Sequence, residues 1–319
     1  MPTATPRPPA DPKATTEARS LLASIYATSR AGEILSGQHN TPRELSSYSD
    51  QARDITGRYP TVWGQDFGFA ADGDQDGISY RAAVVDEALE QHAAGSVITL
   101  MWHAVRPTEE EPVTFDGSIC RGRLDADDWE ALLTPGTEVH QRWTRQVDVV
   151  AAYLARLRDA GIPVLWRPYH EMNGDWFWWG GRGGRRGYAA LYRQLHTRLV
   201  DVHGLHNLVW VWNANAPRED PDDFAAGYAD FYPGHDIVDV LAADVYHDDY
   251  RQSHHDQLRE LAEGRPIALG EVGTLPTSQV LDRQPGWAWF MTWTNFLTEG
   301  NEASAVRALF DDPRVRHRA

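Results

Sequence analysis

The chain has a single cysteine, Cys120, among 319 residues, which excludes an intrachain disulfide and any metal site built from several cysteines. It has no apolar run of 18 residues, so the sequence predicts no membrane-spanning helix. Basic residues are also scarce: 30 Lys and Arg stand against 46 Asp and Glu, for a formal net charge of −16 at pH 7. That charge opposes binding to phosphate backbones and to anionic membrane surfaces, so neither nucleic acid nor membrane is expected as a partner.

Aromatic residues, by contrast, are abundant: 13 Trp, 12 Tyr and 9 Phe. In an acidic chain, many tryptophans favour a surface that stacks on flat, uncharged ligands, and sugars are the obvious candidates. The first residues, 1–14, contain five prolines and predict an extended, unpacked tail. The tail has no signal-peptide core. Two hypotheses stay open: a secreted protein whose signal was removed, which we favour because such tails commonly tether a domain, and a cytosolic protein.

Short apolar runs alternate with helical patterns from residue 34 onward. The runs are Ile34–Gln38, Thr61–Asp66, Ser96–Trp102, Ile162–Arg167, Asn207–Trp212, Ile237–Asp244, Pro266–Gly270 and Gly286–Trp293. Several are apolar on consecutive residues, as in parallel strands buried on both faces. Eight strands alternating with helices predict an α/β fold, a single-domain (β/α)8 TIM barrel over residues 17–319 after a disordered Pro-rich tail over 1–16. The alternative is an open doubly wound sheet, but no Gly-x-Gly-x-x-Gly follows the first run.

Apolar residues at helical spacing occur over 84–89, 143–157 and 188–202. Thr134 followed by Pro135 is expected to begin the second of these helices, because a threonine cap followed by proline is a common helix start. Gly204 is expected to end the third.

The chemistry of such a barrel lies at the carboxyl ends of its strands. Glu171 follows the fourth run and Glu271 the seventh, and these strands lie roughly opposite each other across the barrel mouth. Two opposed carboxyl groups, one protonated and one ionised, are what glycoside hydrolysis requires. The alternative is a pair of structural glutamates that are buried with partners such as Arg167.

Four histidines also follow predicted strands, at positions 39, 103, 170 and 247, and raise the alternative of a metal-dependent hydrolase. Their spacing matches neither His-x-His nor His-Glu-x-x-His. We therefore expect no metal and no other cofactor.

The segment Trp166–Gly180, WRPYHEMNGDWFWWG, resembles the acid/base motif of glycoside hydrolase family 26, best known for β-mannanases. Leu269–Gly273, LGEVG, resembles the end of that family's nucleophile strand. Supporting segments are Ser36–Asn40, Thr56–Pro60, Asp66–Phe67, Trp102–His103 and Pro135–Thr137 with Trp143. The resemblance implies a retaining endo-β-1,4-mannanase that uses a two-glutamate double displacement.

The resemblance also implies a role for each matching residue. Glu171 resembles the general acid/base, and Glu271 resembles the nucleophile that forms a glycosyl-enzyme intermediate. His170 resembles a histidine beside nucleophile and substrate, and Tyr246 a tyrosine whose hydroxyl orients the nucleophile. The other expected substrate-binding residues are Trp176 at the cleavage site, Trp293 as the stacking platform, His103 on the non-reducing side, Arg167 and Asp66.

Two physical expectations accompany these roles. Retaining chemistry places the two carboxyl groups about 5–5.5 Å apart. The acid must keep its proton near neutral pH, so the pKa of Glu171 should be raised, with Trp176 and neighbouring aromatic rings supplying the desolvation. Arg167 and the hydroxyl of Tyr246 should favour the ionised nucleophile.

Two segments depart from the family pattern. Ala104–Pro107 follows Trp102–His103 where an asparagine-containing segment is expected, and Trp212–Asn215 replaces the commoner Ser-Pro-Asn. These positions are expected to affect which sugar is bound and not the two glutamates. Alternatives with the same mechanism are therefore β-1,3-1,4-glucan or β-1,3-xylan as substrate, or an exo-acting enzyme releasing mannobiose. A non-catalytic carbohydrate-binding barrel is the alternative from a different class. We expect a secreted monomer.

Overall fold

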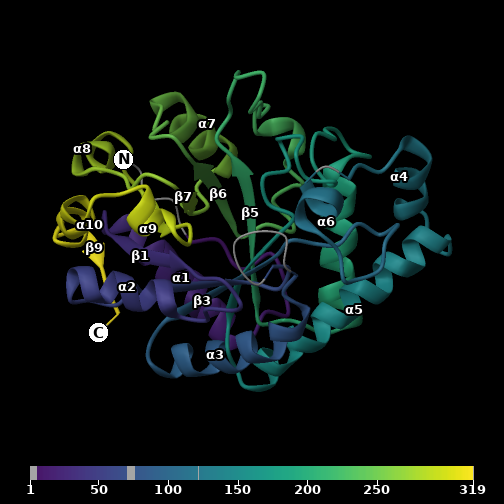
Figure 1. The fold of residues 1–319 in the computed structure, drawn as a ribbon, viewed down its shortest axis with the longest axis horizontal. Helices are drawn as coiled ribbons and strands as arrows, with labels where there is room; N and C mark the ends of the chain where they lie inside the picture. Colours follow the sequence, from purple (N-terminus) through teal and green to yellow (C-terminus); the bar gives the residue numbers. More distant parts are fainter. Residues whose placement is uncertain (1–5, 70–75, 121, 319) are drawn as a thin grey trace.

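Eight parallel strands close into a barrel in the computed structural model, which describes residues 6–69, 76–120 and 122–318 (Figure 1). The barrel strands are β1 (Ile34–His39), β2 (Val62–Asp66), β3 (Val97–Trp102), β4 (Val164–Pro168), β5 (Leu208–Asn215), β6 (Val240–Val245), β7 (Ile267–Val272) and β8 (Trp287–Thr292). Each pairs with the next, and β1 pairs with both β2 and β8, which closes the sheet. A short ninth strand, β9 (Val315–Arg316), adds to the start of β1. The predicted TIM barrel is confirmed.

Each predicted apolar run coincides with one barrel strand, and the boundaries differ most at two places. The sixth strand begins at Val240 rather than at Ile237, and β5 continues past Trp212 to Asn215. The extension of β5 matters for the site, because it places Asn215 at the carboxyl end of the barrel.

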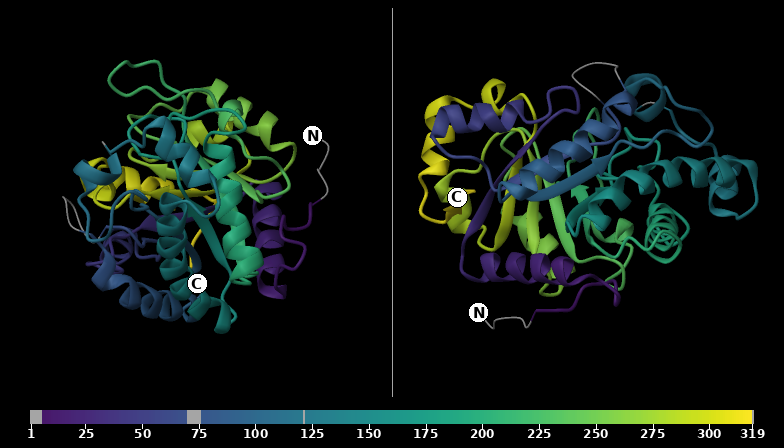
Figure 2. Two further views of the ribbon diagram at one scale, coloured as in Figure 1. Left: turned by 90° about the vertical axis from the view of Figure 1, so that its right-hand side faces the viewer. Right: turned by 90° about the horizontal axis from the view of Figure 1, so that it is seen from below.

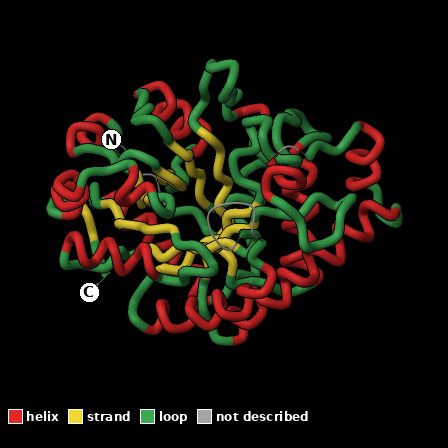
Figure 3. The backbone as a smooth tube through the Cα atoms, viewed as in Figure 1, coloured by secondary structure: helices red, strands yellow, loops and turns green. Residues whose placement is uncertain are grey.

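The helices surround the strands, as the red and yellow segments of Figure 3 show. They are α1 (Thr16–Arg30), α2 (Ser47–Thr56), α3 (Arg81–Ala93), α4 (Ala126–Leu133), α5 (Glu138–Asp159), α6 (Tyr188–Thr197), α7 (Gln252–Ala262), α8 (Ser278–Arg283), α9 (Phe296–Glu299) and α10 (Ala303–Phe310). Short 3-10 or π turns are η1 (Ile78–Tyr80), η2 (Phe115–Cys120), η3 (Arg198–Val202) and η4 (Ala229–Phe231). Within the described ranges, no helix combines the length and the apolar character that crossing a bilayer requires.

The expected start of the long helix before β4 is wrong by three residues. Thr134 ends α4, and α5 begins at Glu138 with Thr137 as its cap, whose hydroxyl accepts a hydrogen bond from the backbone N–H of His140. Gly136 lies between the two threonines with a φ of +92°, a left-handed conformation that a right-handed helix cannot include. The helix therefore starts only after this glycine. Gly204, with a φ of +62°, follows η3 and ends the α6–η3 helix as predicted.

The N-terminal helix closes the amino end of the barrel. Leu21, Leu22 and Ile25 of α1 belong to one buried apolar cluster with side chains from the first residues of the strands, including Val209 and Val240. Figure 2 (right) shows α1 lying across one end of the strands. Because the side chains of α1 pack against those of the strands, water is excluded from the barrel interior at that end.

The segment before α1 differs from the unpacked tail that its prolines predicted. The backbone N–H of Ala10 donates to a carboxylate oxygen of Asp239 at 2.6 Å. Asp11, nearly fully buried, contacts the ring of His206 through its carboxylate at 2.7 Å, and Thr15 caps α1. Composition alone missed these partners because they lie about 200 residues away in the chain. Residues 1–5 lie outside the described residues.

Candidate active site

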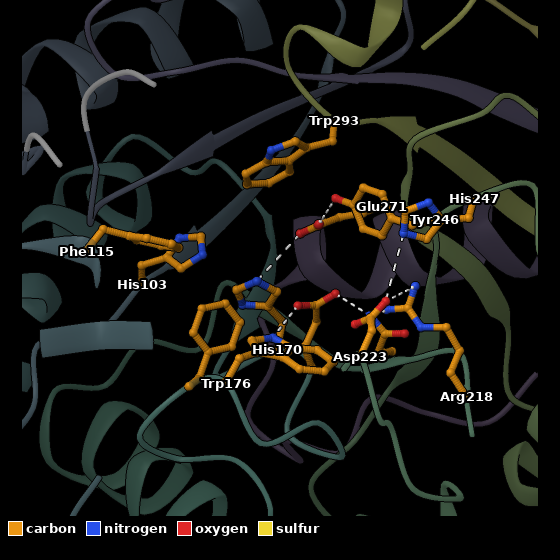
Figure 4. A pocket seen from close by; sticks show the side chains of 13 residues that line it. His103, Phe115, His170, Trp176, Arg218, Asp223, Tyr246, His247, Glu271 and Trp293 are labelled. Atoms are coloured by element: carbon orange, nitrogen blue, oxygen red, sulfur yellow. Dashed lines mark hydrogen bonds and ion pairs between the residues drawn. The ribbon is translucent and has the colours of Figure 1, made fainter. Parts of the chain in front are cut away.

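A cavity of about 300 Å³ opens at the carboxyl ends of the barrel strands (Figure 4). Its lining comes from the last residues of β5 and β7 and from the segments that follow β3, β4, β5, β6 and β8, which is where a barrel of this kind places its site. The lining residues are His103, Phe115, His170, Glu171, Trp176, Phe177, Asn215, Arg218, Asp223, Tyr246, His247, Glu271 and Trp293. The cavity thus brings together seven of the nine predicted site residues, and the other two, Arg167 and Asp66, lie directly behind it.

Glu171 stands on a constrained turn just after β4. Tyr169 and Glu171 both have left-handed backbone conformations, with φ of +49° and +53°. Such conformations cost a non-glycine residue of the order of 1–3 kcal/mol and persist only where the surroundings fix them. Here the N–H of Glu171 donates to the carbonyl of Asn213 at 2.8 Å, and the hydroxyl of buried Tyr169 accepts from Trp143 at 3.0 Å. The turn aims the Glu171 carboxyl into the cavity.

The Glu171 carboxyl has neutral partners. Its Oε1 accepts from the side-chain amide of Asn215 at 2.6 Å, and its Oε2 accepts from the indole N–H of Trp176 at 2.8 Å. Burial, and next the nearby Glu271, raise the pKa of Glu171 to about 7, against which these two hydrogen bonds act. A carboxyl with such a pKa holds its proton near neutral pH, as a general acid must.

Glu271 lies inside β7 and has a cation as its partner. Its Oε1 accepts from the guanidinium of Arg167 at 2.7 Å, and its Oε2 accepts from the hydroxyl of Tyr246 at 2.6 Å. His170 approaches Oε1 at 3.7 Å through its Nε2. The pKa of His170 lies well below its usual range because the ring is buried and close to His103 and Arg167, so the ring is neutral. Arg167 thus places a positive charge against the Glu271 carboxyl group inside the barrel.

A local irregularity of β7 sets the direction of Glu271. The register between β6 and β7 shifts so that Ala243 pairs with Leu269 and Asp244 with Glu271, which leaves Gly270 without a partner in β6. A Cβ on Gly270 would lie 1.7 Å from the side-chain oxygen of Asn213, closer than any real contact. Only glycine fits this bulge, and bulges commonly re-aim a side chain beside an active site.

The two glutamates face each other at close range. Carboxylate oxygens of Glu171, Glu271 and Asp244 all lie within 4.8 Å of one another. This separation suits a retaining pair, whose carboxyl groups lie about 5–5.5 Å apart, and not an inverting pair at about 6.5–9.5 Å. Glu171 and Glu271, one hundred positions apart in the sequence, thus meet at the carboxyl end of the barrel, as their places after the fourth and seventh runs predicted.

Asp244 is a third carboxyl that the sequence did not single out as functional. It is fully buried in β6, 3.8 Å from the guanidinium of Arg167. Burial, and then Glu271, raise the pKa of Asp244 well above its usual range, which favours the neutral acid. Protonation of Asp244 leaves the Arg167 charge to Glu271, which is the closer of the two carboxyl groups.

Asp66 and Arg167 support the site from behind rather than line it. Asp66 at the end of β2 accepts from the backbone N–H groups of Gly68 and His103 and contacts Nδ1 of the His103 ring at 2.8 Å. Burial alone would raise the pKa of Asp66, but its His103 and backbone contacts outweigh it and lower that pKa. The pair thus fixes the orientation of the His103 ring in the cavity wall.

Trp293 forms the roof of the cavity. Its ring stacks on that of His39, with centroids 4.2 Å apart and planes 26° apart, and makes an edge contact with the ring of His103 at 6.2 Å between centroids. Figure 4 shows Trp293 opposite Trp176 across the cavity. Trp176, Phe177 and Phe115 extend the aromatic wall. Flat rings with a few polar groups are the lining expected for a sugar site.

The histidines of the metal-hydrolase alternative do not form a ligand set. Over residues 6–69, 76–120 and 122–318, the group spaced to hold an ion consists of Glu171, Asp244 and Glu271, without a histidine. Arg167 already supplies positive charge to two of these carboxyl groups.

A closed barrel with two facing carboxyl groups among aromatic rings at its carboxyl end is the arrangement of a retaining glycosidase of the TIM-barrel class. The model of Glycosyl hydrolase family 26 matches residues 10–318, and the chain belongs to this family.

Similar proteins include a solved structure, GH26A from Muricauda sp. MAR_2010_75, at 46% identity and a TM-score of 0.92, with 97% of this chain and 98% of that chain covered. A β-mannanase from a symbiotic protist of the termite Reticulitermes speratus, complexed with gluco-manno-oligosaccharide, has 26% identity, a TM-score of 0.80, and 97% and 96% coverage. A mannan endo-1,4-β-mannosidase of Thermothelomyces thermophilus is 33% identical over 94% of this chain. The match spans 59% of that relative's length.

Proposed function

We propose that the protein is a retaining endo-β-1,4-mannanase, with Glu171 as general acid/base and Glu271 as nucleophile. The observation that carries this proposal is the contrast between two facing carboxyl groups. Glu171 has neutral partners and a pKa of about 7, whereas Glu271 is paired with Arg167 and the hydroxyl of Tyr246. Glycoside hydrolysis requires two carboxyl groups whose surroundings keep one protonated and the other ionised.

In the first step, the Glu271 carboxylate attacks the anomeric carbon of the sugar. A bond forms between that carbon and a Glu271 oxygen while the bond to the glycosidic oxygen breaks, and Glu171 gives its proton to the departing oxygen. Arg167 and Tyr246 hold the attacking carboxylate in line with the anomeric carbon.

In the second step, Glu171, now ionised, takes a proton from water. The resulting hydroxide equivalent attacks the anomeric carbon and releases Glu271, so that the product keeps the β configuration. Both glutamates return to their starting protonation states, and no other reactant is consumed.

The choice of mannan rests on the named relatives and on family membership. The fungal relative carries the name mannan endo-1,4-β-mannosidase, and the protist relative was solved with a gluco-manno-oligosaccharide.

A substrate panel tests this choice. Reducing-sugar release is measured with β-mannan, glucomannan, mixed-linkage β-1,3-1,4-glucan and β-1,3-xylan. The proposal expects mannan and glucomannan to be the best substrates, with products of mixed length appearing early from mannohexaose. Preference for glucan or xylan would show that mannan is not the substrate. Early release of mannobiose alone would indicate exo action. Binding without turnover would indicate a carbohydrate-binding barrel.

We expect Tyr246→Phe to lower kcat by about 10- to 100-fold, because it removes a hydrogen bond to an ionised carboxylate. Tyr250→Phe is the matched control: the Tyr250 hydroxyl donates to the carbonyl of Thr274 outside the cavity. Steady-state kinetics on mannan should show a large loss in the first variant and less than about twofold in the second. Equal losses would contradict the assigned role of Tyr246.

The pH profile of kcat/KM should fall on its alkaline side with an apparent pKa of about 7, because Glu171 must enter the reaction protonated and loses its proton above that pH. Asn215→Ala removes a hydrogen bond that lowers the pKa of Glu171, so the alkaline limb should move to higher pH. An alkaline limb that stays in place or moves to lower pH in this variant would contradict the assignment.

Secretion and a monomeric state stay predictions of the same proposal. A polymer such as mannan is met outside the cell, which agrees with an acidic chain and with a sugar-binding cavity at which Trp176 and Trp293 lie, whereas the other tryptophans are buried in the core. Light scattering of the purified protein tests the oligomeric state.

A further inference from the structure

The segment that follows β5 forms a small hairpin beside the cavity, with Arg218 on one arm and Asp223 on the other. We propose that Arg218 and Asp223 together bind the first sugar of the leaving group. The inference rests on the proposed function and goes beyond it, because it assigns the recognition of the departing chain to a hairpin outside the family motifs named above.

The pair has a fixed, two-point geometry. The guanidinium Nη2 of Arg218 donates to Oδ1 of Asp223 at 3.0 Å, and Nη1 lies 2.9 Å from Oδ2. The hairpin backbone holds both arms, because Arg218 and Ala225 exchange two backbone hydrogen bonds of 2.9 and 3.0 Å. The Arg218 side chain is only 11% exposed. The Asp223 side chain is 36% exposed. A bidentate pair with a largely covered arginine keeps its orientation better than a pair of long side chains in solvent.

The hairpin is joined to the turn that carries Glu171. Asn173 accepts from the backbone N–H of Ala226 at 2.9 Å and of Asn215 at 2.8 Å, and its amide donates to the carbonyls of the same two residues. The pair therefore keeps a constant position relative to the proposed acid. The acid protonates the glycosidic oxygen of the leaving sugar. Side chains that lie beside the Glu171 carboxyl group, on the side away from Glu271, therefore face that sugar.

The cavity has two distinct sides. Figure 4 shows His103 and Phe115 on one side and Arg218, Asp223 and His247 on the other. The first side is aromatic, and the second is charged. The Nε2 of His247 lies 3.9 Å from Oδ2 of Asp223, and its side chain is largely exposed. We assign the charged side to the leaving group because it adjoins Glu171.

Open space continues beyond the pair. Arg218 also lines a second cavity of about 400 Å³, with Phe224, Arg251 and Gln257 on its walls. Phe224 is one of few large apolar side chains in the described residues that stay about half exposed, at 48%. A leaving chain longer than one sugar therefore finds room past Arg218 rather than a closed wall.

The chemistry of the pair suits a sugar. Arg218 offers N–H donors and Asp223 offers carboxylate acceptors, and the two lie side by side, as vicinal hydroxyl groups do on a pyranose ring. The Nε of Arg218 is buried and has no hydrogen-bond partner among the described atoms. The positive charge of Arg218 and the negative charge of Asp223 balance each other, so the pair does not require a charged ligand.

The test compares a sugar leaving group with an aryl leaving group. Mannotetraose departs as a sugar, whereas 2,4-dinitrophenyl β-mannobioside departs as a phenolate and needs no sugar contact. For Arg218→Ala, the ratio of kcat/KM on mannotetraose to kcat/KM on the aryl mannobioside should fall by about 10- to 100-fold, the effect of a lost charged hydrogen bond. Asp223→Asn, which keeps the arginine and the hairpin, should lower the ratio in the same direction.

Arg193→Ala is the matched control, since Arg193 forms a bidentate pair with Asp236 away from the cavity. It should leave the ratio unchanged. A second measurement follows the glycosyl-enzyme: in Arg218→Ala, mannobiose should compete less well against methanol as acceptor. A loss shared equally by both substrates in the Arg218 and Asp223 variants would overturn the proposal, while aryl mannobioside turnover by the wild type would still support the proposed function.

Discussion

Glu271→Gln is expected to lower kcat on mannan by on the order of 10⁵-fold, with substrate binding largely retained. The amide keeps the size of the side chain and an acceptor for Arg167, but it cannot attack the anomeric carbon. Steady-state kinetics measures kcat, and calorimetric titration with mannopentaose measures binding. Retained binding with lost turnover separates removal of the nucleophile from loss of the fold.

Azide supplies the control for this prediction. In Glu271→Ala, azide has space to replace the carboxylate and should yield an α-glycosyl azide from an aryl β-mannobioside, with inverted configuration. Circular dichroism checks that the variant folds, because it leaves Arg167 without its 2.7 Å partner. Turnover of mannan that persists within about tenfold of wild type would exclude Glu271 as nucleophile.

Glu171→Ala is expected to lower kcat/KM on mannan by about 10²–10⁴-fold, the contribution of general acid catalysis. The loss should depend on the leaving group. A dinitrophenolate needs no proton, so formation of the glycosyl-enzyme from the aryl mannobioside should proceed at close to the wild-type rate, while its hydrolysis becomes slow. Pre-steady-state kinetics should therefore show a burst of dinitrophenol.

Azide should accelerate the slow second step in Glu171→Ala, because it needs no base, and should give a β-glycosyl azide. The two glutamate variants thus predict opposite anomers from the same reagents, which nuclear magnetic resonance distinguishes. Equal losses on mannan and on the aryl substrate, without a burst, would assign Glu171 a structural role instead.

The architecture and the central pair of carboxyl groups could be predicted because both are local in the sequence. Each buried strand is a short apolar run. Glu271 comes directly after the run Pro266–Gly270, and Glu171 comes four residues after Arg167, the last residue of the fourth run. The geometry of the barrel then brings the strand ends together without further information. The direction of the pKa shift of Glu171 could be predicted, but its causes are burial and then Glu271 from another strand, while the hydrogen bond from Trp176 acts in the opposite direction.

The packing of the N-terminal segment could not be predicted from composition. Prolines over 6–12 suggested an unpacked tail, yet Asp11 meets His206, and Ala10 meets Asp239. These partners lie at the amino end of the barrel and become neighbours only when the barrel has closed. The packing of the apolar face of α1 could not be predicted for the same reason, because that face covers the open amino end of the barrel, which exists only in the closed fold.

The charged side of the cavity was missed for a related reason. Segment 217–223, PREDPDD, has the composition of a solvated loop, and nothing in it indicates that Arg218 and Ala225 pair. Asp244 was likewise treated as an ordinary strand-end residue. The pKa of Asp244 is raised by burial and by Glu271 and Glu171, which approach it from β7 and from the turn after β4.

The most direct measurement is to trap the glycosyl-enzyme with 2,4-dinitrophenyl 2-deoxy-2-fluoro-β-mannobioside and to locate the label by peptide mass spectrometry. The fluorine slows both steps, and the dinitrophenolate speeds only the first, so the covalent intermediate accumulates. The label is predicted on the peptide that contains Glu271, with one sugar moiety per chain. A label on Glu171 or Asp244, or an unlabelled enzyme that gives α-configured first products from mannan, would contradict the account.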